Sequence, residues 1–194
     1  MRQSTQRRRP TEPLVLGAIL TALVVILQYL GQFIRFGPFA ISLVLVPIVI
    51  GAAVCGPKVS TWLGFVFGLV VLMTDAAAFY AISVPGTVVT VLVKGAACGL
   101  VAGLVYRALE RFNRYVAVAV AAILCPIVNT GIFLLGCVLF FFEAIQSWGM
   151  DAGFGTAIEY MFLGLAGGNF LFELGFNLVL SPMIVRLLRI RARS

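Results

Sequence analysis

Apolar residues dominate this chain in six stretches, and a membrane-spanning helix needs about 20 such residues to cross a hydrocarbon core of ~30 Å. Turn-forming or polar segments separate the stretches, among them Gly37-Pro38, Gly56-Pro57-Lys58 and the polar run 107–114. The pattern predicts an all-α polytopic membrane protein whose 194 residues form one domain of six transmembrane helices. These helices are expected at about 14–33, 38–55, 59–78, 86–106, 116–142 and 160–185.

The composition supports this class and removes several kinds of chemistry. Apolar residues make up 62% of the chain and charged residues 11%, against roughly a quarter charged in a soluble domain. The chain has no His, which excludes His-based proton relays, Ser/His/Asp triads and imidazole metal ligands. It also lacks a GxxxxGK[ST] phosphate loop and a GxSxG elbow. We therefore expect no enzyme activity, no cofactor and no metal, and we expect the four Cys to be small buried apolar side chains.

The charges indicate an orientation. The net charge is +7, and with six spans twelve of the fourteen basic residues fall on the side that holds both termini. The positive-inside rule makes that side the cytoplasm, with residues 1–12 as a basic tail and residues 143–159 as an outer loop that carries Glu143, Asp151 and Glu159. The basic surplus indicates contact with anionic lipids rather than with nucleic acid.

Few polar side chains lie at membrane depth, where an ionisable group costs ~2.5–3.5 kcal/mol and needs a partner or a function. Lys94 lies in the fourth predicted helix, Asn129 beside Pro126 in the fifth, and Gln28 in the first. Four more share one face of the sixth helix at four-residue spacing. They are Asn169, Glu173, Asn177 and Ser181. Two interpretations remain open. Lys94 and Glu173 neutralise one another and the amides hold helices together, or these groups line a pocket that opens to the outside.

Aromatic and small residues add two further expectations. Aromatic residues near the predicted outer ends are mainly expected to form an interfacial belt. They are Phe36, Phe39, Phe79, Tyr80, Trp148, Phe154 and Tyr160. Small residues recur at four-residue spacing and allow close helix approach. The glycines of this kind are expected in internal packing, at Gly64 and Gly68, at Gly95, Gly99 and Gly103, and at Gly164 and Gly168. Ala18 and Ala22 form a similar pair on the first helix.

Several segments together resemble the substrate-binding (S) components of bacterial energy-coupling factor (ECF) vitamin transporters. They are the Ala18-xxx-Ala22 pair, the stretch 41–52 followed by Cys55-Gly56-Pro57, the stretch 85–95 that contains Thr87, Thr90 and Lys94, and the stretch 125–131. The length, the six predicted helices and the basic N-terminal tail are similar as well. The segments look most similar to pantothenate-type S components, with folate-type and riboflavin-type next.

The resemblance implies a substrate-capture subunit of the bacterial plasma membrane that binds a small anionic vitamin from outside. It implies partners as well, namely a transmembrane coupling protein that docks on Ala18 and Ala22, and two cytoplasmic ATPases. Lys94 suits an anionic ligand. The candidate substrate-binding residues are Lys94, Asn129, Asn169, Glu173, Thr87 and Thr90. The alternative is a non-transport membrane subunit whose polar stripe only joins helices.

Overall fold

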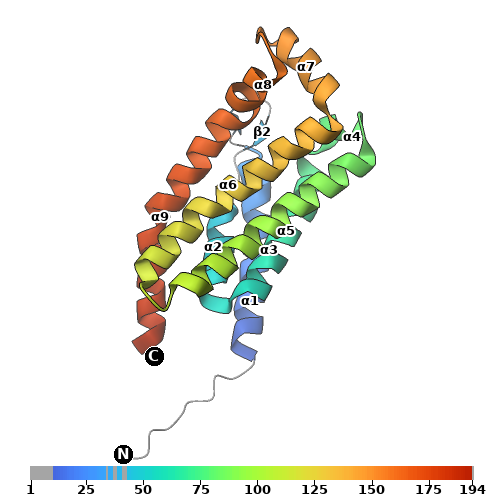
Figure 1. Ribbon diagram of the computed structural model, residues 1–194. Coiled ribbons are helices and arrows are strands. Elements are labelled where there is room, and N and C mark those ends of the chain that lie inside the picture. The colour runs from blue at the N-terminus through green and yellow to red at the C-terminus, as the bar shows by residue number, and fades with distance from the viewer. Residues whose placement is uncertain (1–10, 34, 37–38, 41–42, 194) are drawn as a thin grey trace, which may run out of the picture.

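The computed structural model describes residues 11–193 apart from 34, 37–38 and 41–42, so the predicted basic tail lies almost entirely outside it. Its elements are, in chain order, α1 (Thr11–Gly31), β1 (Arg35–Phe36), β2 (Phe39–Ala40), α2 (Leu45–Cys55), α3 (Pro57–Thr74), α4 (Ala77–Tyr80), α5 (Val84–Leu109), α6 (Arg114–Phe140), α7 (Phe142–Asp151), α8 (Ala157–Glu159), the π-helix η1 (Tyr160–Gly167) and α9 (Gly168–Arg193). The chain is thus a helical bundle, as predicted (Figure 1).

Local chemistry explains several helix ends. Gly56 has a φ of 90°, which glycine adopts without strain, and Pro57 follows at the first position of α3. The Ser83 hydroxyl accepts a hydrogen bond of 3.2 Å from the backbone N–H of Gly86 and so caps α5. Asn113 caps α6 in the same way, with a hydrogen bond of 2.8 Å from the first turn. The turn predicted at Gly56-Pro57 is confirmed.

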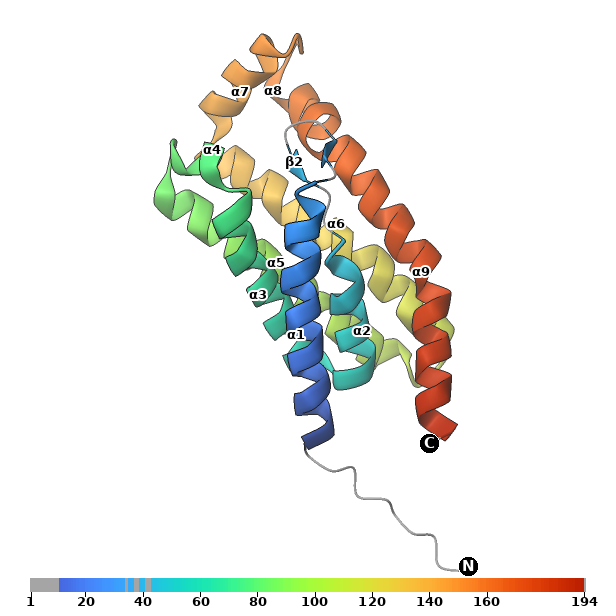
Figure 2. The ribbon, with the colours of Figure 1, turned by 180° about the vertical axis from the view of Figure 1, so that it is seen from behind.

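Within the described residues, five helices are long and apolar enough to cross a membrane, and they agree with five of the six predicted spans. They are Pro13–Gly31, Pro57–Thr74, Val84–Leu109, Arg114–Phe140 and Ala157–Arg186. The last of these runs through α8, η1 and α9 as one continuous rod, which Figures 1 and 2 show along one side of the bundle.

The predicted span 38–55 is wrong in its first half. Among the residues of this span that the structure describes, only Leu45–Cys55 is helical, and its 11 residues extend about 16 Å at 1.5 Å per residue, roughly half of a ~30 Å hydrocarbon core. The chain before α2 instead forms a short antiparallel hairpin in which Arg35 pairs with Ala40. Helix α2 is therefore a short inner helix, packed against α1, α3, α5, α6 and α9.

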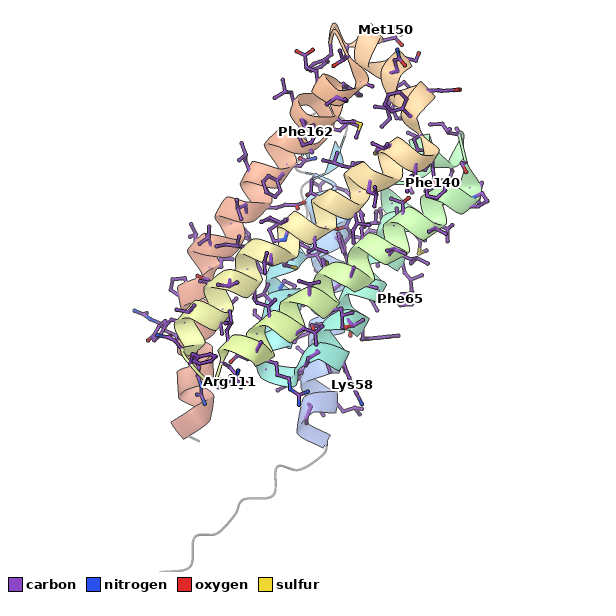
Figure 3. All side chains as sticks on the ribbon, viewed as in Figure 1. Lys58, Phe65, Arg111, Phe140, Met150 and Phe162 are labelled. Atoms are coloured by element: carbon purple, nitrogen blue, oxygen red, sulfur yellow. The ribbon has the colours of Figure 1, made fainter. Side chains whose placement is uncertain are left out.

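The two ends of the bundle differ in character. Helix α1 begins and α9 ends at the same end, which we call the terminal end, as expected for an even number of passes (Figures 1 and 2). Lys58 and Arg111 lie there, while Met150 lies at the opposite end (Figure 3). We call that opposite end the loop end, because it carries α4 and α7. The predicted outer loop 143–159 lies at the loop end, and most of it is helical because it contains α7 and α8.

Two apolar clusters form the core. The larger one surrounds α2 and includes the fully buried side chains of Leu45, Ile48 and Phe67. The smaller one lies toward the loop end and includes Phe79 and Tyr160, which are 4% and 8% exposed. These two aromatic residues are therefore core residues, and the prediction that they join an interfacial belt is wrong for them. Phe36 and Phe39 lie where the structure describes no side chains.

Glycines lie in the contact between α3 and α5, which agrees with the internal packing predicted for them. A Cβ atom on Gly64 would overlap the backbone carbonyl of Gly95, and one on Gly99 would overlap the carbonyl of Ser60. At Gly103 it would come within 2.5 Å of the Cα atom of Pro57. Only glycine allows this backbone-to-backbone contact, which extends from the terminal end to the middle of the bundle.

Candidate functional site

A cavity of about 80 Å³ lies inside the bundle, walled by all the long helices. The short α2 contributes none of its described residues to the wall, whereas α1, α3, α5, α6 and α9 all do. The cavity lies in the half of the bundle toward the loop end. Two of its lining residues show this, because Asp75 directly follows α3 and Phe79 lies in α4. The polar residues of the wall are Gln28, Asp75, Lys94, Asn129, Thr130, Asn169 and Glu173.

Four of the six predicted substrate-binding residues line this one cavity. Lys94 comes from α5, Asn129 from α6, and Asn169 and Glu173 from α9. These residues are far apart in the sequence, so their meeting at one wall is a tertiary feature. The α9 stripe also faces inward as predicted, because Glu173, Asn177 and Ser181 are all buried.

The other two predicted residues, Thr87 and Thr90, lie elsewhere on α5. The Thr87 hydroxyl donates a 2.7 Å hydrogen bond to the carbonyl of Ser83 in its own helix. Thr90 packs against Gly136 of α6, where an added Cβ atom would overlap the threonine side chain. Both threonines are buried, and the structure brings neither to the cavity wall.

Lys94 is held between two aromatic rings. Its Nζ atom lies 5.8 Å from the ring centre of Phe67 and 5.1 Å from that of Phe133, a cavity residue. Cation–π contacts contribute ~0.5–2 kcal/mol each, which offsets part of the cost of an ammonium group at this depth. The carboxylates of Asp75 and Glu173 line the same cavity. The site therefore has one cation, two carboxylates and an aromatic wall.

Three amide oxygens at the wall are buried and unsatisfied. They are Oε1 of Gln28 and Oδ1 of Asn129 and Asn169, and the described part of the chain gives none of them a hydrogen-bond partner. A buried acceptor without a donor costs about 1–3 kcal/mol. Amides that served only to join helices would be expected to satisfy one another across the helix contacts. The wall can thus accept hydrogen bonds from a ligand that carries N–H or O–H donors.

Phe79 lines the cavity and lies in α4, at the loop end. Its ring makes edge contacts with Phe133, Phe141 and Trp148 at centroid distances of 5.7, 4.9 and 5.6 Å. Trp148 lies in α7, so these contacts connect the helix at the loop end directly to a cavity residue. Sequence reasoning does not single out Phe133, and it places Phe79 only among the aromatic residues near the predicted outer ends, because aromatic residues are common in an apolar chain.

A profile of the family described as "ECF transporter, substrate-specific component" matches residues 13–185. The chain belongs to this family. The match covers every helix that lines the cavity and leaves out only the two ends of the chain. Comparisons with curated proteins and with solved structures found no match. The resemblance stated from the sequence is therefore confirmed at the level of the family, and membership sets aside the alternative of a non-transport subunit.

Members of the ECF substrate-specific family are membrane proteins that bind small-molecule substrates and are not enzymes. They work with an ECF module, which consists of a transmembrane protein and ATPases. The multi-pass membrane location predicted from the sequence agrees with the five long apolar helices.

Ala18 and Ala22 lie on the outward face of α1. Both are exposed, while Leu20, Val24 and Gln28 on the opposite face are buried in the bundle. The small side chains of this pair therefore do not serve contacts inside the chain. Nearby, the indole N–H of Trp62 on α3 donates a 3.3 Å hydrogen bond to the Thr21 hydroxyl.

Proposed function

We propose that this ECF substrate-specific component captures a small anionic vitamin from outside and holds it in the cavity described above. The observation that carries the proposal is the wall itself, where Lys94, Asn129, Asn169 and Glu173 meet in the half of the bundle toward the loop end. An ATP-driven coupling module, docked at Ala18 and Ala22, then delivers the vitamin to the cytoplasm.

Pantothenate is the vitamin we favour, with folate and riboflavin next. Its carboxylate suits the ammonium group of Lys94. Its two hydroxyls and one amide N–H are three donors, and the wall holds three unsatisfied amide oxygens, those of Gln28, Asn129 and Asn169. The match in number of donors and acceptors supports a polar anion of this kind over an apolar ligand.

The experiment that tests the proposal is a titration of purified protein with pantothenate. A charge-assisted contact contributes ~1.5–3 kcal/mol, so Lys94→Ala should weaken binding about ten- to a hundredfold. Lys58→Ala is the matched control, because Lys58 is an exposed lysine at the terminal end, and it should bind like the wild type.

The same titration separates binding from simple neutralisation of Glu173. If Lys94 serves only that carboxylate, each single alanine variant loses folded yield, and Lys94→Ala/Glu173→Ala recovers both yield and pantothenate binding. That recovery would remove Lys94 from the site. Wild-type protein that binds neither pantothenate, folate nor riboflavin would contradict the vitamin assignment.

We also propose that the terminal end faces the cytoplasm. The basic residues of that end, including Lys58, Arg111 and Arg186, support this by the positive-inside rule. In a background without the four native Cys, a cysteine at Asp151 should react with an impermeant thiol reagent from outside. A cysteine at Arg111 should react only after the membrane is permeabilised, and labelling of both from one side would contradict the orientation.

A further inference from the structure

Gln28 interrupts the buried apolar face of α1. Leu20 and Val24 precede it at four-residue spacing, and Gln28 itself is only 2% exposed. Its Nε2 group donates a 3.3 Å hydrogen bond to Oδ2 of Asp75, at the end of α3. Gln32, four residues further along the chain and directly after the end of α1, donates a 2.6 Å hydrogen bond to the same oxygen.

Asp75 determines which way the Gln28 amide points. An ionised carboxylate only accepts hydrogen bonds, so the NH₂ group of the amide must face Asp75. The carbonyl oxygen Oε1 is then directed away from Asp75. That oxygen is buried at the wall of the cavity and has no partner among the residues that the structure describes. An amide with a free orientation would rotate to satisfy both ends, whereas this one is held with its acceptor unsatisfied.

We propose that Gln28 Oε1 is a specificity-determining acceptor for a hydroxyl or amide N–H donor of the transported substrate, and that Asp75 is its positioning residue. The inference rests on the proposed function and extends it, because it gives a specific role to α1, whereas the substrate-binding residues predicted from the sequence all lie on α5, α6 and α9. It requires a substrate with a donor some distance from its carboxylate, held between α1 and Lys94 on α5.

Gln32 provides the matched control. It directly follows the same helix and donates to the same Asp75 oxygen, but it does not line the cavity. A purely structural role would make the two glutamines equivalent, since each joins α1 to α3 through Asp75. A role in substrate binding would make them different.

The experiment compares Gln28→Met and Gln32→Met by titration with pantothenate, and with folate and riboflavin in parallel. Methionine keeps the length of the side chain and removes the acceptor. Gln28→Met should weaken binding by about ten- to a hundredfold, and Gln32→Met should stay within about threefold of the wild type.

A second variant covers the case in which Gln28→Met does not fold. In Gln28→Glu/Asp75→Asn the new amide donates to the new carboxylate, and one carboxylate oxygen at position 28 remains an acceptor at the cavity. This exchange keeps the net charge of the cavity and should bind pantothenate within about fivefold of the wild type, whereas Gln28→Leu/Asp75→Asn should not.

The outcomes distinguish this inference from the proposed function. If the wild type binds one of the three vitamins and the two methionine variants lose affinity equally, or not at all, the role of Gln28 is overturned while the proposed function stands. The inference is likewise overturned if Gln28→Leu/Asp75→Asn binds as well as Gln28→Glu/Asp75→Asn. If the wild type binds none of the three vitamins, both are overturned.

Discussion

Helix α5 touches α3 backbone to backbone through Gly95, Gly99 and Gly103, whereas the residue directly before these glycines, Lys94, projects into a polar cavity. The first region has no room for a methyl group at its contacts, and the second leaves buried acceptors such as Asn129 Oδ1 without donors among the described residues. In lipid, close packing supplies much of the stability of a helix bundle. We infer from this contrast that the glycine contacts stabilise the fold. The unsatisfied polar groups of the cavity lower its stability but are available to bind a substrate.

The largest effect should come from filling a glycine contact. A leucine at Gly64 would collide with the backbone of Gly95, which cannot move aside as a flexible side chain would. We expect Gly64→Leu to cost more than about 3 kcal/mol and to abolish folded yield in size-exclusion chromatography.

Gly175→Leu is the control, because Gly175 in α9 has no atom within 4 Å of an added Cβ among the described residues. This variant should elute and unfold like the wild type. Equal yields for the two leucine variants would contradict the assignment of stability to the α3–α5 contact.

The second effect concerns small residues that face outward. Replacing Ala18 and Ala22 by Trp should leave substrate binding within about twofold and reduce ATP-driven uptake more than tenfold, because the coupling protein would lose a close helix contact. Uptake and binding are measured in proteoliposomes and in detergent, respectively.

Val179→Trp/Met183→Trp is the matched control for this pair, since it places two indole side chains at the same four-residue spacing on the exposed face of α9. Its uptake should be normal. A double-Trp variant of Ala18 and Ala22 that neither folds nor binds would refute the docking assignment.

The third test looks for opposite changes in stability and binding at one residue. Asn129→Leu removes a buried unsatisfied oxygen at 5% exposure, so the thermal midpoint should rise, by an amount that corresponds to about 1 kcal/mol. The affinity for pantothenate should fall about tenfold. A lower midpoint would instead show that Asn129 joins helices.

The smallest effect is expected at Thr90. Its buried hydroxyl has no partner within the described chain, and its side chain packs against Gly136 rather than the cavity. Thr90→Val keeps the shape of the side chain, so both affinity and midpoint should change little, with affinity within about twofold. A loss of affinity above fivefold would return Thr90 to the site.

The long helices could be predicted because each combines an apolar run with turn chemistry at its ends, as at Gly56-Pro57 and Ser83. The segment before Leu45 could not, since a short apolar run does not distinguish a helix from a hairpin. Helix α2 is short because the chain before it forms a hairpin in which Arg35 pairs with Ala40, and a hydropathy pattern does not reveal such a pairing.

The residues of the candidate site also fall into those that could be predicted from the sequence and those that could not. Lys94 and Glu173 could be predicted because charge is costly in an apolar span, and Asn169 because it shares a helix face with Glu173. Asp75 could not, because a carboxylate at a helix end resembles an ordinary loop residue until α1 is known to pack beside it. Thr87 and Thr90 came from the family resemblance, and their burial in helix contacts was not visible in the sequence.

The central claim is that this cavity holds the transported substrate. Mass spectrometry of small molecules released from protein purified without added vitamin measures this. Wild-type protein and Thr90→Val should release the same compound in near-equimolar amounts, and Lys94→Ala should release less than about a tenth as much. A Lys94→Ala protein that retains as much of the compound as the wild type, or a wild type that retains none, would contradict the claim.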